Sequence, residues 1–289
     1  MPSTILVTDH KGLWNESLGQ ISDLLARMER AGFNRDLLAR MRAEPDYLAR
    51  LAWAANLGAF TESYSQMEAR LVLRQNFFGA MEWWRLVGIP LTQGHLRLID
   101  EFPWPAELID KPDKFEPEKH IWETHIAFPM WVSTGSAQSL EMISLKWLFH
   151  RFENLFFQPP GVVELGLSQY ELFREPVGFP RWYLVRLEAP NITTGKTLTE
   201  QLDSIPDGYE AAPALIATAA HLFYMLSHGY FYRQKGFGRC ADRPVDGKCV
   251  SVNTSASESH VELSRSAGAR IDIVGLNLMR KLPEAGGLR

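Results

Sequence analysis

The stretch EAAPALIATAAHLFYMLSHGYFY, residues 210–232, decides the fold of the second half of this chain. It is apolar around most of a helical projection, and a helix that is hydrophobic on nearly all sides is buried in a core. Pro213 stands in its first turn, where the missing N–H of proline costs little. The stretch therefore predicts one long helix that packs against a sheet.

The segments on either side of this helix mix two hydrophobic periods. Strand patterns occur in HIWETHIAFPMWVS (120–133) and RWYLVRLEA (181–189). Helical spacing occurs in SLEMISLKWLFHRFENLFF (139–157) and TLTEQLDSI (197–205). RCADRPVDGKCVSVN (239–253) predicts a hairpin that turns at Asp246-Gly247. Strands and helices in this irregular order are typical of an α+β fold, here with a mainly antiparallel sheet.

Helical periodicity dominates residues 16–102, where apolar residues recur three and four positions apart. The longest such segment, ESYSQMEARLVLRQNFFGAMEWWRLVG (62–88), is expected to break near Gly79. PWPAELIDKPDKFEPEKH (103–120) follows, and its four prolines end helices and stiffen the connection. We therefore predict a helical domain at residues 1–112 and an α+β domain at residues 113–289.

Composition narrows the class of protein. The chain has 289 residues, of which 46% are hydrophobic, and its 9 Trp and 16 Phe require a core. Its net charge of −4 argues against nucleic acid as the main partner. There is no apolar run of about 18 residues and no signal-peptide pattern, so no membrane contact is expected. We predict a cytoplasmic protein in which Cys240 and Cys249 are free thiols.

Gly195-Lys196-Thr197 resembles the end of a phosphate-binding P-loop. Such a loop needs a further glycine five positions before Gly195, but this chain has Pro190, which lacks a donor N–H. Thr197 and Glu200 have the spacing of a helix capping box. We predict a helix cap here and no nucleotide site.

A helix pair at residues 77–99, joined at Gly88-Ile89-Pro90, is compatible with a helix-turn-helix. Its second helix would present Gln93, His95 and Arg97 to base edges. Residues 1–102 carry eleven basic and twelve acidic side chains, a net charge of −1. An ordinary helical hairpin is therefore the preferred interpretation, and DNA binding is an alternative.

Histidine and arginine give the candidate catalytic residues. His125 lies in the first predicted strand and Arg186 in the second, while His221 and His228 lie seven positions apart on the long helix. Seven positions separate two helical side chains by about 10 Å, too far to share one zinc ion. His120, Glu123 and His125 share one face of neither a strand nor a helix. We predict no metal site and no cofactor.

Several stretches together resemble an uncharacterised family of bacterial proteins. They are RQNFFGAMEWWRLVGI, THIAF, WYLVRLEAP, GKTLTEQ and AAHLFYMLSHGYFY. Members share an Asn-Phe-Phe-Gly helix, a strand that ends in a short proline loop, and a later helix with a histidine. The resemblance covers residues 50–289 and implies a bacterial protein, but no activity and no functional residue.

Three function classes remain open. Because no complete catalytic motif is present, we favour a non-catalytic binding or regulatory protein. A protein partner or a small ligand is expected more than nucleic acid. The first alternative is an enzyme whose site is assembled from His125, Arg186, His221 and His228. The second is a DNA-binding protein that uses the helix pair at residues 77–99.

Overall fold

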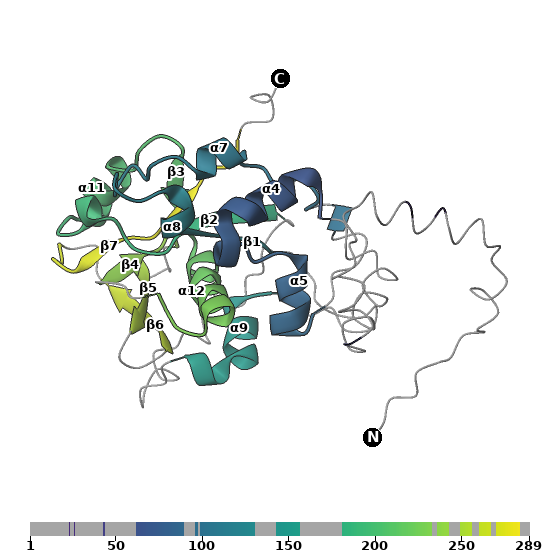
Figure 1. The fold of residues 1–289 in the computed structure, drawn as a ribbon. Helices are drawn as coiled ribbons and strands as arrows, with labels where there is room; N and C mark the ends of the chain where they lie inside the picture. Colours follow the sequence, from purple (N-terminus) through teal and green to yellow (C-terminus); the bar gives the residue numbers. More distant parts are fainter. Residues whose placement is uncertain are drawn as a thin grey trace. The chain divides into compact units, whose positions relative to one another are not determined.

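The structure is a computed structural model, and it describes part of the chain. The described residues are 23, 26, 43, 62–89, 96–97, 99–130, 143–156, 181–232, 236–242, 249–255, 260–266 and 270–283. The chain divides into two compact units, Met1–Leu57 and Gly58–Arg289. The helices predicted before residue 58 lie outside the described residues, apart from residues 23, 26 and 43, which are helical. The helices and strands whose bounds the structure describes all lie in the second unit (Figure 1).

One sheet has four antiparallel strands in the order β1-β2-β8-β3. The strands are β1 (His125–Met130), β2 (Arg181–Arg186), β8 (Leu278–Arg280) and β3 (Tyr209–Ala211). β1 and β2 pair along their full length, from His125 opposite Arg186 to Met130 opposite Arg181. Since β1 lies at the sheet edge, it tolerates Pro129, which cannot donate to a ladder on both sides.

A second sheet has the order β6-β5-β4-β7. Its strands are β6 (His260–Ser266), β5 (Cys249–Ser255), β4 (Phe237–Arg239) and β7 (Val274–Leu276). Only the β4–β7 pair is parallel. The side chain of Asn277 packs closely against β4 at Gly238. Glycine is needed there, because a Cβ on residue 238 would lie 2.0 Å from Oδ1 of Asn277.

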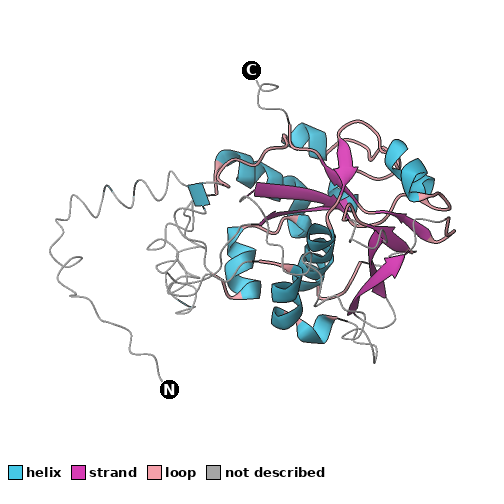
Figure 2. Cartoon of the chain, turned by 180° about the vertical axis from the view of Figure 1, so that it is seen from behind, coloured by secondary structure: helices cyan, strands magenta, loops and turns pink. Residues whose placement is uncertain are grey.

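Short helices connect and cover the strands (Figure 2). The α-helices are α4 (Tyr64–Leu73), α5 (Ala80–Glu82), α7 (Ala106–Ile109), α8 (Ile121–Thr124), α9 (Leu145–Arg151) and α11 (Leu198–Asp203). The 3-10 turns are η2 (Arg74–Asn76), η4 (Glu153–Leu155) and η6 (Asn191–Thr193), and η3 (Trp83–Val87) is a π-helix.

The long helix α12 (Ala214–His228) contacts strands of both sheets. Every residue from Ala214 to Tyr224 is buried. Phe223 stacks on Phe78 with a centroid distance of 4.3 Å and meets the edge of Trp83 at 4.8 Å. The prediction of a buried helix packed against a sheet is therefore confirmed, and the helix begins directly after Pro213.

The α+β class is also confirmed, while the helical N-terminal domain lies mostly outside the described residues. The strand predicted at residues 120–133 is wrong at its start, because Ile121–Thr124 form the helix α8. The carboxylate of Glu123 accepts a hydrogen bond of 2.7 Å from the backbone N–H of His120. This bond satisfies a free helix-end donor, which favours a helical turn over an extended chain.

The break predicted near Gly79 is confirmed, since the chain leaves α4 and η2 and begins α5 after that glycine. Phe78 donates its backbone N–H to the carbonyl of Ala127 at 2.8 Å, which joins this break to β1. Residues on both sides of position 112 thus share one core. The domain boundary placed there stays a prediction.

Two further predictions concern the second sheet and the long apolar segments. β4 and β5 pair antiparallel, as the hairpin required, although Asp246-Gly247 lies outside the described residues. Cys240 and Cys249 are both buried and form no disulfide with each other, as predicted. Within the described residues, no helix is long and apolar enough to cross a membrane.

Candidate functional site

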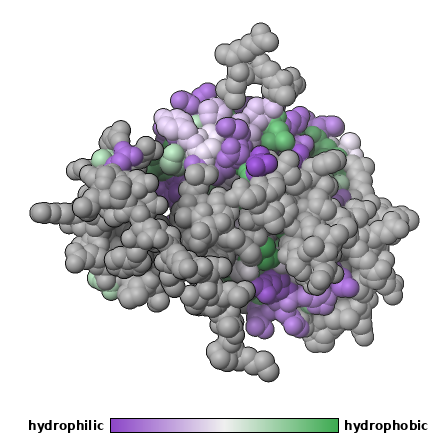
Figure 3. All heavy atoms as spheres, turned by 90° about the vertical axis from the view of Figure 1, so that its right-hand side faces the viewer, coloured by the Kyte–Doolittle hydropathy of each residue, from purple (hydrophilic) through white to green (hydrophobic). Residues whose placement is uncertain are grey.

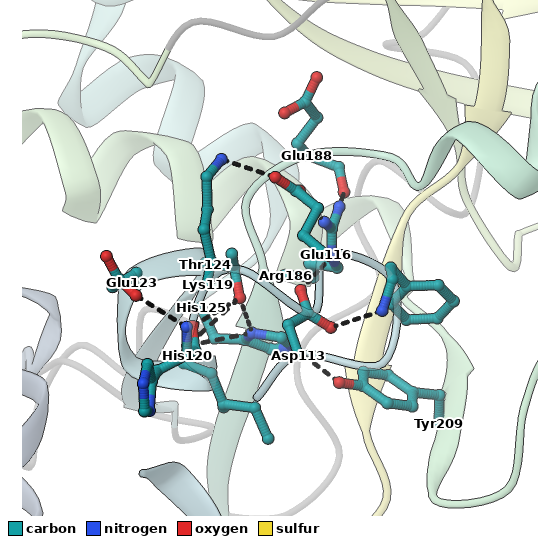
Figure 4. A network of polar contacts seen from close by, with 12 residues as sticks. Asp113, Glu116, Lys119, His120, Glu123, Thr124, His125, Arg186, Glu188 and Tyr209 are labelled. Carbon is teal, nitrogen blue, oxygen red and sulfur yellow. Dashed lines mark hydrogen bonds and ion pairs between the residues drawn. The ribbon is translucent and has the colours of Figure 1, made fainter. Parts of the chain in front are cut away.

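The structure brings two of the four candidate catalytic residues together. His125 is the first residue of β1 and Arg186 the last of β2, so they face each other across the ladder. Asp113 joins them from the proline-rich segment before α8, and all three side chains are buried (Figure 4). This arrangement follows from strand pairing and from a loop folded over the end of the sheet.

Arg186 is the centre of the charged part of this cluster. Its Nε donates to Oδ2 of Asp113 at 3.0 Å, and its other nitrogens donate to the carboxylate of Glu116 and the carbonyl of Glu188. Burial acts to raise the pKa of Asp113, but the guanidinium of Arg186 and the hydrogen bond from the backbone N–H of Phe115 act against it, and the pKa is lowered. With a neutral His125, the guanidinium of Arg186 is the charge that holds Asp113 ionised.

The hydrogen bonds of His125 define its tautomer. Nδ1 lies 3.2 Å from the carbonyl of Ile121 and 2.8 Å from the hydroxyl of Thr124. Because a carbonyl only accepts, Nδ1 carries the proton and Nε2 accepts from the hydroxyl of Tyr209 at 3.2 Å. Burial is the main cause that lowers the pKa of His125 to about 3. The imidazole is therefore neutral at physiological pH.

The cluster ties a loop to the sheet. Two backbone hydrogen bonds close this loop, which spans residues 111–121. The N–H of Asp113 donates to the carbonyl of Lys119 at 2.7 Å, and the N–H of Ile121 donates to the carbonyl of Lys111 at 2.9 Å. Arg186 is 2% exposed and His125 is fully buried, so a substrate reaches neither unless the loop moves. A guanidinium, an imidazole and a carboxylate therefore lie close together, and all three are buried.

The other two candidate catalytic residues lie on α12. His221 is fully buried, and burial lowers its pKa to about 4. His228 is half-buried at the end of the helix, where its ring stacks on Tyr224 with a centroid distance of 3.8 Å. Burial lowers the pKa of His228, and the hydrogen bond to the carbonyl of Tyr224, which acts to raise the pKa, only partly offsets this effect. These positions give α12 two neutral imidazoles at physiological pH.

The nucleic-acid candidates are only partly described. Gln93 and His95 lie outside the described residues, and Arg97 is exposed on a helical turn. The first helix of the pair ends at Gly88, whose φ of 78° is the left-handed conformation expected at a helix stop. The helix-turn-helix interpretation stays a prediction.

The Gly195-Lys196-Thr197 segment forms the predicted helix cap. The hydroxyl of Thr197 accepts from the N–H of Glu200 at 3.3 Å, and the Glu200 carboxylate accepts from the N–H of Thr197 at 2.8 Å. These bonds and Arg270 lower the pKa of Glu200 to about 2. The capping-box prediction is confirmed.

An open pocket of about 610 Å³ lies beside this cap. Lys196 and Arg270 line it together with Glu200 and Asp203, so its formal charges balance. Arg270 is already ion-paired with Glu200. In the part of the chain that the structure describes, no group of three or more His, Cys, Asp or Glu is placed to hold a metal ion.

One surface was missed by sequence reasoning. On α4 the large apolar side chains of Tyr64, Met67 and Leu71 are 72%, 48% and 78% exposed. They lie three and four positions apart and therefore form one stripe, which we call the α4 stripe. Figure 3 shows the side of the molecule that lies to the right in Figure 1, with green hydrophobic patches among purple hydrophilic ones. The spacing was visible in the sequence, but it did not show which face of the helix is buried.

Arg74 continues this surface beyond the end of α4. It is the only non-glycine residue with positive φ in the described part of the chain, with a φ of 53°. Its guanidinium lies 5.1 Å from the ring centroid of Trp122 on α8. A side chain held in an unfavoured backbone conformation and stacked on an indole is fixed in place at the surface.

Asn76, two residues after Arg74, has an unusual hydrogen-bond environment. Asn76 donates from Nδ2 to the carbonyl of Trp122 at 2.7 Å, and its buried Oδ1 has no hydrogen-bond partner among the residues that the structure describes. A buried polar atom without a partner costs free energy, so such groups call for an explanation. The strain and the unsatisfied acceptor occur together at the edge of the α4 stripe.

No family model, curated protein or solved structure matches this chain. The function is therefore argued from the geometry of these residues alone.

Proposed function

We propose that this chain is a non-catalytic binding protein, and that its binding surface consists of the α4 stripe with Arg74 and Trp122. The observation that carries the proposal is the exposure of Tyr64, Met67 and Leu71 on one face of one helix. Single exposed apolar residues are ordinary, but contiguous apolar surface on a soluble domain marks interaction sites.

The composition of the surface supports a protein partner. Tyrosine, tryptophan, arginine and methionine are the residue types enriched in protein interfaces and their hot spots. The stripe presents apolar side chains at helical spacing, which is how an amphipathic helix engages an apolar groove or a second helix. The opposite face of α4, with Ala69 and Leu73, is anchored in the core and keeps the stripe in position.

Charge supports one feature of the partner. Arg74 is exposed, and it forms no ion pair with any carboxylate in the described part of the chain. A partner that supplies a carboxylate opposite Arg74 would gain a charge-assisted hydrogen bond. The partner surface is therefore apolar at its centre and acidic at one end.

Capture with matched variants tests the proposal. Tagged wild-type protein and the variants Leu71→Glu and Ile192→Glu are incubated with a bacterial cytoplasmic extract, and bound proteins are quantified by mass spectrometry. Ile192 is 51% exposed on η6 and serves as the control for a new surface charge. A partner retained by wild type and Ile192→Glu but lost with Leu71→Glu is expected. Equal capture by all three proteins would remove the α4 stripe from the proposal.

The two alternatives remain predictions with their own tests. An enzyme built on His125 and Arg186 requires the loop at residues 111–121 to open. Amide hydrogen exchange of the backbone N–H groups in that loop measures how often it opens. DNA binding by the pair at residues 77–99 requires an affinity that falls steeply with salt. We place the binding function in the bacterial cytoplasm as part of the same proposal.

A further inference from the structure

The open pocket beside the cap of α11 is lined by charges of both signs. Lys196 and Arg270 bring positive charge to it, and Glu200 and Asp203 bring negative charge. Its volume of about 610 Å³ lies within the range of small-ligand sites, roughly 300–1,000 Å³. Because the lining is polar, a ligand in this pocket has to be held by charges and hydrogen bonds.

Two of the four charges are committed to each other, and two are available. The carboxylate of Glu200 accepts from the N–H of Thr197 at 2.8 Å and from its hydroxyl at 3.0 Å, and it pairs with Arg270. Lys196 and Asp203 form no ion pair and no side-chain hydrogen bond with any residue that the structure describes. Lys196 therefore offers a cation to a ligand, and Asp203 offers an anion.

The two hydroxyl groups of the lining add hydrogen-bond acceptors. Thr194 donates its hydroxyl hydrogen to the carbonyl of Asn191 at 2.8 Å, and Ser204 donates its own to the carbonyl of Gln201 at 2.8 Å. A hydroxyl has one donor and two acceptor lone pairs, so both oxygens are left with accepting capacity only. An ammonium group has three donors and no acceptor, and it matches these oxygens as well as the carboxylate of Asp203.

A buried polar network fixes the loop that carries Lys196. Gln201 donates from Nε2 to the carbonyls of Thr193 at 2.7 Å and Val274 at 2.8 Å. Nη1 of Arg239 donates to Oε1 of Gln201 at 2.9 Å and to the carbonyl of Lys196 at 3.1 Å. Gln201 and Arg239 are both fully buried. A site on backbone that is already fixed in this way loses less conformational freedom when a ligand binds.

We propose that this pocket binds a small zwitterion with a carboxylate and a primary ammonium group, as found in a free amino acid or a short peptide. Lys196 and the unused N–H groups of Arg270 receive the carboxylate, and Asp203 receives the ammonium group with the two hydroxyls. A simple anion would leave Asp203 uncompensated, and a simple cation would leave Lys196 uncompensated. The inference goes beyond the proposed function, because the pocket shares no residue with the α4 stripe.

Titration of the full chain by ligand-observed NMR tests the inference. The probes are glycine, 4-aminobutyrate and triglycine, which carry the same two charges at increasing separation. Exposed ion pairs are weak, so we expect a Kd between about 0.1 mM and about 10 mM for the best of them. Tightest binding by either amino acid supports free amino acids as the ligand, and tightest binding by triglycine supports peptides.

Acetate and ethylamine, which carry one charge each, should bind at least about tenfold more weakly than the best zwitterion. If they bind equally well, the pocket does not select for two charges and the inference is wrong. Absence of binding by all three zwitterions up to about 100 mM also overturns it.

Matched variants locate the binding. Lys196→Gln and Asp203→Asn should each raise the Kd of the best zwitterion at least about tenfold. Lys146→Gln and Asp207→Asn remove the same charges at exposed positions that do not line the pocket, and should leave the Kd unchanged. Circular dichroism melts check that all four variants fold. Zwitterion binding that both pocket variants retain would occur at another surface and would overturn the inference.

The amide of the best zwitterion tests which charge each side chain receives. This amide keeps the ammonium group but has no carboxylate, so Lys196→Gln should not weaken its binding further, whereas Asp203→Asn should. Equal losses for the zwitterion and its amide with Lys196→Gln would show that Lys196 does not contact the carboxylate, and would overturn the proposed arrangement.

Discussion

The stability of this protein should fall as the pH is lowered from 7 to 5, because two buried histidines cannot accept protons in the folded state. His125 and His221 have folded pKa values of about 3 and about 4, and burial is the main cause for both. An unfolded histidine has a pKa of about 6.5. Between these values only the unfolded chain binds the protons, so acid favours unfolding.

The magnitude depends almost entirely on the unfolded state. For each histidine, protonation stabilises the unfolded chain by about 0.2 kcal/mol at pH 7 and by about 2 kcal/mol at pH 5. The folded pKa hardly enters this difference while it stays near 4 or below. His125 and His221 together should therefore reduce the free energy of unfolding by about 4 kcal/mol between pH 7 and pH 5.

Urea denaturation at several pH values, followed by circular dichroism, measures this loss. His125→Asn keeps a donor toward the carbonyl of Ile121 but removes the titrating group, and should abolish about 2 kcal/mol of the pH-dependent loss. His221→Asn should do the same, and the double variant should keep only the smaller pH-dependent loss that comes from other groups, such as the half-buried His228, whose pKa burial also lowers. Asp113 does not contribute, because its lowered pKa acts only below this range.

The reasoning is refuted if His125→Asn and His221→Asn lower stability equally at pH 7 and pH 5. That result would mean that the folded protein takes up protons at these histidines as readily as the unfolded chain.

Three further changes probe the local structure by urea denaturation. Asp113→Ala should cost about 1–3 kcal/mol because it leaves the buried Nε of Arg186 without its acceptor while Glu116 still pairs with the guanidinium, and Asp113→Ala/Arg186→Met should recover part of that loss. Thr197→Ala should cost about 1 kcal/mol by removing the hydroxyl acceptor at the start of α11, while Thr197→Ser should cost little. Gly238→Ala should destabilise by about 1–3 kcal/mol or more, because its Cβ would collide with the side chain of Asn277; an unchanged midpoint would show that this side chain can move aside at no cost.

The distance along the sequence explains which parts of the candidate site could be predicted. The cap at Thr197 and Glu200 involves residues three positions apart, so its spacing indicated the hydrogen bonds directly. Arg186 and Asp113 are 73 positions apart, and no local pattern links them. His125 and Arg186 were chosen by residue type alone, and the β1–β2 register made them neighbours.

The α4 stripe shows a second limit. Ala69 and Leu73 alternate with Met67 and Leu71 around one short helix, and both sets are apolar. The sequence predicts such a helix but not which of two apolar faces meets the core. The choice follows from the break at Gly79, which turns the chain so that Phe77 and Phe78 pack beside β1.

The sequence by itself determined the α+β class, the buried helix at residues 214–228 and the cap at Thr197, because hydrophobic period and capping bonds act within a few residues. The tertiary structure alone decided that His125, Arg186 and Asp113 form one closed cluster and that Tyr64, Met67 and Leu71 stay in water. These outcomes depend on contacts between segments far apart in the chain. Such contacts are set by how the two sheets and α12 fill a common core, and no single segment encodes that arrangement.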